Sequence, residues 1–136
     1  MTTWKLIVGI FLILHGGVHL LYAGQSKEMF ELQPGMTWPV GSWAFSRILG
    51  SGATRTATSV SLLLAALVFL AAGISLLAGQ PAWRPIATVA AVFSTLVYLL
   101  MWNGKFQALD NQGFVGILIN IAILVAVLVF KWPPLG

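Results

Sequence analysis

The chain has 136 residues, of which 59% are hydrophobic and only 7% are charged. A soluble globular domain carries roughly 25% charged residues, so this composition excludes an ordinary water-soluble domain and predicts an integral membrane protein. The net charge is +4, but the basic residues are scattered singly, and this distribution argues against nucleic-acid binding. The chain has no cysteine, which excludes disulfides and thiolate metal sites.

The first apolar stretch, Leu6 to Tyr22, is long enough to cross a bilayer, for which roughly 17–25 helical residues suffice. It contains His15 and His19, whose spacing places both imidazoles on one face of a helix, and Tyr22 continues that face. A polar side chain at membrane depth is a functional candidate by default, because its transfer into hydrocarbon is costly. The two histidines also interrupt what would otherwise read as a signal peptide, so we expect a retained helix.

A long connection, residues 23–56, follows the first span and is rich in residues typical of turns: Pro34, Gly35, Pro39, Gly41, Gly50 and Gly52. Within it, apolar residues recur at helical spacing: Val40, Trp43, Ala44 and Ile48. This spacing predicts a short helix, for which two interpretations remain open. It either lies on the membrane surface as an interfacial anchor or folds over the mouth of a helix bundle.

Three further apolar stretches follow, Val60 to Ala78, Ile86 to Trp102 and Phe114 to Phe130. They are continuous rather than alternating, which favours helices over barrel strands. Aromatic residues stand at the expected span ends, where interfacial rings prefer to lie: Trp4, Tyr22, Trp83, Trp102 and Trp132. Asp110 or Asn111 is a candidate cap for the last helix. Because the later connections are short, we predict one all-α domain, an up-down-up-down four-helix transmembrane bundle over residues 1–136.

Polar side chains of different spans are expected at matching depths. Counting helical rise from the span ends places Ser94, Thr95 and Asn120 level with His15. A shallower layer contains His19, Ser59 and Tyr98. The candidate ligand-binding residues are therefore His15, His19, Tyr22, Thr95, Tyr98 and Asn120.

Two alternatives to a ligand site remain open for these residues. Polar side chains between membrane helices often serve only to hold the helices together, and Asn120 fits that role. His15 and His19 can also share a metal ion, as helical histidine pairs do in zinc sites, but no third ligand can be assigned. No catalytic residue is identified, and whether the protein is an enzyme stays open.

The segment from Gly9 to Gly17, with His15 before two glycines, resembles the first helix of the DoxX-like membrane proteins, as does the continuation from His19 to Gly24. The segment from Trp102 to Phe106, together with Asn120, is similar to a related group of bacterial four-helix proteins. DoxX is associated with a thiosulfate:quinone oxidoreductase, so the resemblance implies a quinone-linked or accessory role in the bacterial inner membrane. A lysine is common in the family where this chain has His19.

The leading functional hypothesis is a membrane protein that binds a lipophilic small molecule, such as a quinone, in a pocket near His15 and His19. Imidazole there would donate a hydrogen bond or move a proton. The alternatives are an accessory or self-associating subunit of a larger membrane complex, and a small transporter or channel.

The basic residues do not indicate which way the protein is oriented in the membrane. We nevertheless expect both termini in the cytoplasm, because the long connection and the acids then face outward.

Overall fold

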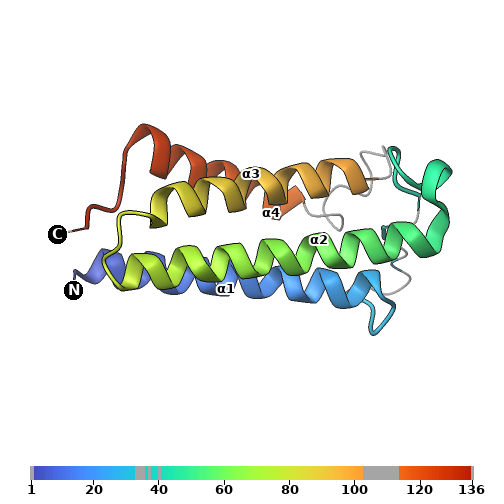
Figure 1. Ribbon diagram of the computed structural model, residues 1–136, viewed down its shortest axis with the longest axis horizontal. Coiled ribbons are helices and arrows are strands. Elements are labelled where there is room, and N and C mark those ends of the chain that lie inside the picture. Colours follow the sequence, from blue (N-terminus) through green and yellow to red (C-terminus); the bar gives the residue numbers. More distant parts are fainter. Residues whose placement is uncertain (1, 33–35, 37, 40, 103–113, 136) are drawn as a thin grey trace.

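The computed structural model describes residues 2–32, 36, 38–39, 41–102 and 114–135. These residues form helices and no strand, so the all-α prediction is confirmed. The elements are α1 (Thr3–Ser26), α2 (Ser46–Leu77), α3 (Trp83–Met101), α4 (Phe114–Leu124) and the π-helical turn η2 (Val125–Val129), which continues α4 (Figure 1).

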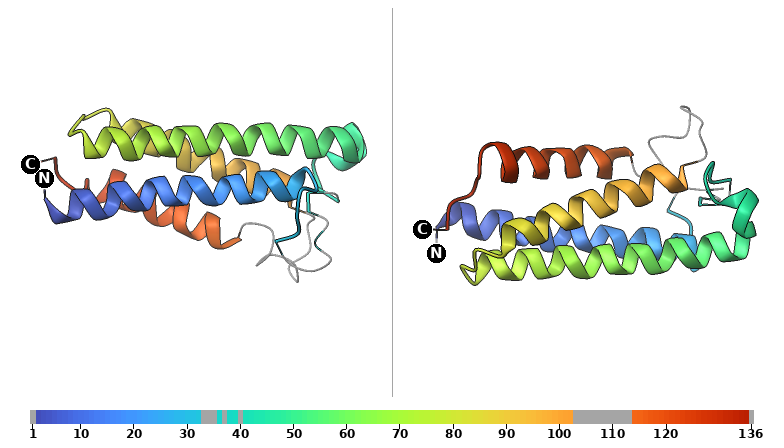
Figure 2. Two further views of the ribbon diagram at one scale, coloured as in Figure 1. Left: turned by 90° about the horizontal axis from the view of Figure 1, so that it is seen from below. Right: turned by 45° about the horizontal axis from the view of Figure 1, so that its top comes forward.

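The helices lie side by side along the long axis of the molecule, and both termini lie at the same end (Figure 2). We call this end, where α3 begins and η2 ends, the terminal end, and we call the opposite end the mouth end. Backbone contacts join α1 to α2, α2 to α3, and α3 to α4 and η2. In the described residues, α1 and α4 approach each other through side chains only.

Three of the helices, α1, α2 and α3, are long and apolar enough to cross a membrane, and α4 with η2 forms a shorter apolar helix, Phe114–Val129. Large hydrophobic side chains on every helix face outward, among them Leu14, Leu67, Val89 and Leu128. An apolar outer surface of this extent is costly in water and suits a lipid environment.

The second helix begins earlier than hydropathy predicted, at Ser46 rather than near Val60, so the first connection shortens to residues 27–45. Gly50, with φ 77°, interrupts the helical geometry, and residues 46–49 form a separate turn before it. Of the residues predicted to form a short surface helix, Ile48 lies in this turn, whereas Trp43 and Ala44 precede it and Val40 lies outside the described residues. The proposed caps Asp110 and Asn111 also lie outside them.

The first connection is hydrogen-bonded to the mouth ends of α1 and α3. The buried amide of Gln25 donates to the Met36 carbonyl oxygen at 3.0 Å and accepts from the Leu32 N–H at 2.8 Å. On the other side, Ser42 Oγ donates to the Leu100 carbonyl at 2.6 Å, and Trp43 Nε1 donates to the Leu99 carbonyl at 2.7 Å. The segment therefore lies across the helix ends.

Glycines bring α1 and α2 into close contact near the terminal end. A Cβ atom added at Gly73 would lie 2.7 Å from the Gly9 carbonyl oxygen and 2.6 Å from a side-chain carbon of Ile13. No side chain fits between these two backbones. The adjoining core packs Leu12 of α1 against Phe69 of α2.

Candidate functional site

Four buried polar side chains from three helices form a closed ring of hydrogen bonds at mid-depth. His15 Nε2 lies 2.8 Å from Asn120 Oδ1, and Asn120 Nδ2 donates to Ser94 Oγ at 2.9 Å. Ser94 Oγ lies 2.6 Å from His19 Nε2, and His19 Nδ1 lies 2.8 Å from the His15 carbonyl oxygen. The ring thus joins α1, α3 and α4, although α1 and α4 share no backbone contact.

The donors and acceptors of this ring fix the tautomers of both imidazoles. The His15 carbonyl can only accept, so His19 Nδ1 carries a proton. The Nε2 atom of a neutral His19 then accepts from the Ser94 hydroxyl, which in turn accepts from Asn120. Asn120 Oδ1 accepts from His15 Nε2–H. With both imidazoles neutral, each of the four hydrogen bonds has one donor and one acceptor.

Thr95 extends the ring on its outer side. The second N–H of Asn120 donates to Thr95 Oγ1 at 3.1 Å, and the Thr95 hydroxyl donates to the Ala91 carbonyl at 2.8 Å. Both donors of the Asn120 amide are therefore used, as a buried amide requires.

Aromatic rings enclose the two histidines. Phe69 of α2 packs edge-on against His15, with ring centroids 4.8 Å apart, and lies 5.1 Å from His19. Towards the mouth end, Tyr98 lies 5.8 Å from His19. Tyr22 packs on Tyr98 at 5.2 Å, and Trp38 of the first connection covers both tyrosines. Trp38 is itself only 2% exposed, so this aromatic layer is buried.

The six candidate residues named from the sequence lie in one continuous cluster. His15, His19, Thr95 and Asn120 belong to the hydrogen-bonded group, and Tyr98 and Tyr22 belong to the aromatic layer above it. Ser94, which the depth count placed level with His15, makes the central hydrogen bonds. No sequence pattern indicated Trp38 or Phe69, because their contacts join segments far apart in the chain.

An apolar pocket of about 230 Å³ lies between α1 and α4, on the terminal side of the ring. Phe11 joins the two features, since it lines the pocket and stacks parallel to His15 with ring centroids 6.0 Å apart. The lining residues come from α1, α3, α4, η2 and the segment after η2: Val8, Phe11, Leu12, Trp83, Ile119, Ala122, Ile123, Ala126, Val127 and Trp132.

Trp83 was expected at the membrane interface, but its side chain is only 1% exposed and lines this pocket. Its Nε1 atom is buried and has no hydrogen-bond partner within the described part of the chain. An indole N–H usually finds a partner when it is buried. Because this atom is buried beneath the pocket surface, the wall of the pocket is almost entirely apolar.

Among the described residues, no three His, Cys, Asp or Glu side chains come together in a group that could hold a metal ion. His15 and His19 use three of their four ring nitrogens in the hydrogen bonds of the ring. Comparison of the chain with protein-family models, curated proteins and solved structures finds no match.

Proposed function

We propose that the protein is an integral membrane up-down-up-down four-helix bundle that binds a lipophilic small molecule in the pocket between α1 and α4. The observation that carries this proposal is the apolar pocket, whose wall includes the rings of Trp83 and of Phe11, which is stacked on His15. We further propose that this membrane is a bacterial inner membrane and that both termini lie in the cytoplasm.

The size and lining of the pocket indicate the class of ligand. A cavity of about 150 Å³ lined by apolar residues binds benzene, so the 230 Å³ available here suits a bicyclic ring or a length of hydrocarbon chain. A quinone has both an apolar ring and carbonyl oxygens, and it is also the ligand that the resemblance to the DoxX-like proteins suggests.

The hydrogen-bonded ring has a supporting role in this proposal. It holds α1 and α4 at a fixed separation through His15 and Asn120, on the mouth side of the pocket. In the described residues the backbones of α1 and α4 are not in contact, which leaves room for the pocket between them. The hydrogen bond between His15 and Asn120 keeps these two helices from separating further.

Binding can be tested with menadione, a naphthoquinone that quenches tryptophan fluorescence, because Trp83 and Trp132 both line the pocket. We expect saturable quenching of the detergent-purified wild type. Ala126→Phe places a phenyl ring in the pocket and should abolish the saturable component, whereas Ala71→Phe, at an exposed position of α2, should retain it.

Equal quenching of the Ala126→Phe and Ala71→Phe variants would show that menadione partitions into detergent or binds elsewhere. Organic extracts of wild type purified from membranes, examined by mass spectrometry, give a second measurement that does not depend on the choice of probe. A lipophilic compound retained by wild type and lost from Ala126→Phe identifies the natural ligand.

The closed ring favours a second candidate, an accessory or self-associating subunit that binds no small molecule. In this case the polar side chains only hold the helices together, which is the common role of such groups in membranes. A stable complex with a larger membrane enzyme, combined with unsaturable menadione quenching, would favour this candidate over the first.

A further inference from the structure

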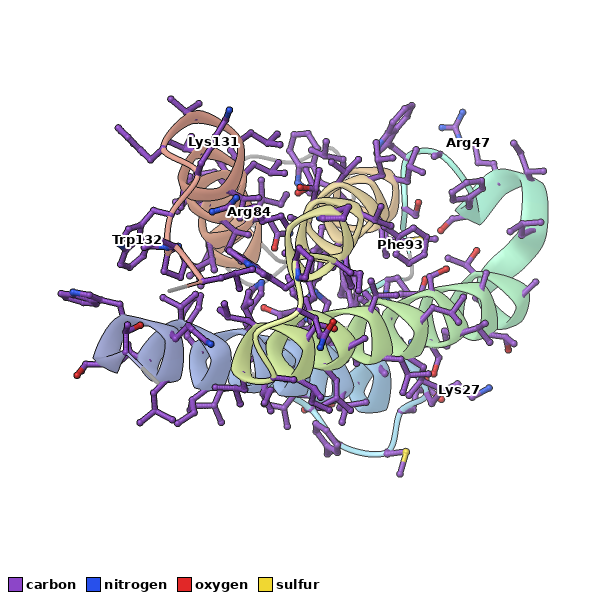
Figure 3. All side chains as sticks on the ribbon, turned by 60° about the vertical axis from the view of Figure 1, so that its left-hand side comes forward. Lys27, Arg47, Arg84, Phe93, Lys131 and Trp132 are labelled. Carbon is purple, nitrogen blue, oxygen red and sulfur yellow. The ribbon has the colours of Figure 1, made fainter. Side chains whose placement is uncertain are left out.

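The terminal end of the molecule has a positive charge that no described acid offsets. Lys5, Arg84 and Lys131 lie there, whereas the described acids Glu28 and Glu31 follow α1 at the mouth end. Figure 3 shows Arg84, Lys131 and Trp132 close together, far from Lys27 and Arg47. At the mouth end, Glu28 offsets part of the charge by pairing with Arg55 at 3.0 Å.

A pocket of about 540 Å³ lies between Arg84 and Lys131 on the outside of α3 and η2. Its two cations lie at the terminal end together with Pro85, and Thr88, Val89, Val127 and Leu128 lie about one turn deeper along each helix. The pocket is thus cationic at one end and mostly apolar at the other. A phospholipid has the same arrangement, with a charged phosphate next to hydrocarbon chains.

Arg84 is held in place but keeps hydrogen-bonding capacity. Its Nη2 atom donates to the carbonyl oxygens of Lys131 at 2.6 Å and Pro133 at 3.4 Å, and its guanidinium lies over the Trp83 ring at 5.6 Å. Its Nε atom is buried, but no described acid pairs with the guanidinium. The positive charge of Arg84 is therefore available to attract a phosphate oxygen.

Lys131 adopts a backbone conformation that favours glycine. Its φ is 51°, in the left-handed region, directly after the helical residues end. A residue with a Cβ atom pays roughly 1–2 kcal/mol there, and the position is usually glycine. The backbone conformation therefore does not explain a lysine at this position.

The depth of the pocket matches the headgroup region of a bilayer. Trp4 and Trp132 pack edge-to-face at the same end, with ring centroids 5.5 Å apart, and both are exposed. Tryptophan pairs of this kind prefer the boundary between headgroups and hydrocarbon. Lys131 is adjacent to Trp132 in the chain, so its charge lies at the level of lipid phosphates.

We propose that the pocket between Arg84 and Lys131 binds the phosphate of an anionic phospholipid, with an acyl chain along Val89 and Leu128. The charge of this end and the polarity gradient of the pocket together select an anionic lipid over a zwitterionic one. The proposal rests on membrane insertion but is independent of ligand binding between α1 and α4.

The test is thermal unfolding of delipidated, detergent-purified protein titrated with phosphatidylglycerol, phosphatidylcholine or inorganic phosphate. We expect phosphatidylglycerol to raise the unfolding midpoint saturably, and the other two to have no comparable effect. Lys131→Gly removes the cation, and glycine adopts the positive φ of this position without strain. The variant should therefore fold and bind phosphatidylglycerol about fivefold more weakly.

Lys27→Gly, which removes an exposed cation at the mouth end, is the matched control and should bind phosphatidylglycerol like wild type. Equal weakening by both substitutions would show a general charge effect and overturn the site. An equal response to phosphatidylcholine, or to inorganic phosphate alone, would overturn the anionic lipid. A midpoint that does not respond to phosphatidylglycerol would also overturn the proposal, whatever the result with menadione.

Discussion

At the scale of single residues, Ser94 is the member of the hydrogen-bonded ring whose loss affects most partners. Ser94→Ala would leave His19 Nε2 without its donor and Asn120 Nδ2 without one acceptor, both in a buried position. A buried group left unpaired costs about 1–3 kcal/mol, although average values within membranes are nearer 0.6 kcal/mol. We expect a loss of about 1–2 kcal/mol, measured as the free energy of unfolding in mixed detergent micelles.

Two threonines of α3 provide an internal control for this prediction. Thr95 and Thr88 each donate to the carbonyl four residues earlier, at 2.8 Å and 2.9 Å, but only Thr95 also accepts from Asn120. Thr95→Val should therefore destabilise the protein more than Thr88→Val, and less than Ser94→Ala. Equal effects of all three substitutions would mean that the ring contributes nothing beyond the local helix.

At the scale of elements, the contact between α1 and α2 depends on Gly73. Gly73→Ala would place a methyl group 2.7 Å from the Gly9 carbonyl oxygen, so the two helices would have to separate. Overpacking of this kind costs about 1–3 kcal/mol. We expect a loss of stability in this range, measured by the same unfolding assay.

Gly17→Ala is the matched control, because a Cβ atom added at Gly17 meets nothing within 4 Å. Alanine has a higher helix propensity than glycine, so this substitution should be neutral or slightly stabilising. If Gly17→Ala were as harmful as Gly73→Ala, backbone flexibility rather than close packing would explain both glycines.

Hydropathy predicted where the apolar helices lie, but not where α2 begins. Hydropathy measures the free energy of transfer into hydrocarbon, and residues 46–59 are too polar to be recognised as part of an apolar stretch. Their polar side chains are hydrogen-bonded within the protein: Thr54 and Thr58 donate to the carbonyls of Gly50 and Thr54, and Arg55 donates to the Ser26 carbonyl. Hydropathy does not detect such hydrogen bonds, so it places the start of the helix too late.

The polar ring was partly predictable because helical rise converts sequence position into depth. Depth counting placed His15, Ser94, Thr95 and Asn120 in one layer, and the structure joins them through hydrogen bonds. It assigned His19 to a shallower layer with Ser59 and Tyr98; His19 does lie beside Tyr98, but it also bonds to Ser94 of the deeper layer. Depth says nothing about rotation around the helix axis, and rotation decides which side chains meet.

At the scale of the whole molecule, the proposed bundle predicts which connections share a side of the membrane. Gln80 precedes α3 and Lys131 follows η2, both at the terminal end, whereas Lys27 follows α1 at the mouth end. The chain has no cysteine, so single substitutions can be labelled without background. In membrane vesicles of known orientation, a membrane-impermeant maleimide should label Thr3→Cys, Gln80→Cys and Lys131→Cys from one side.

Lys27→Cys should be labelled from the opposite side only. Lys131 is the informative position, because α4 with η2 is shorter than the other three helices. If Lys131→Cys were labelled from the same side as Lys27→Cys, the last helix would not cross the bilayer. The pocket between α1 and α4 would then face a different environment, and both proposed ligand sites would need revision. Labelling of both Thr3→Cys and Lys131→Cys from the cytoplasmic side would place both termini in the cytoplasm, as expected.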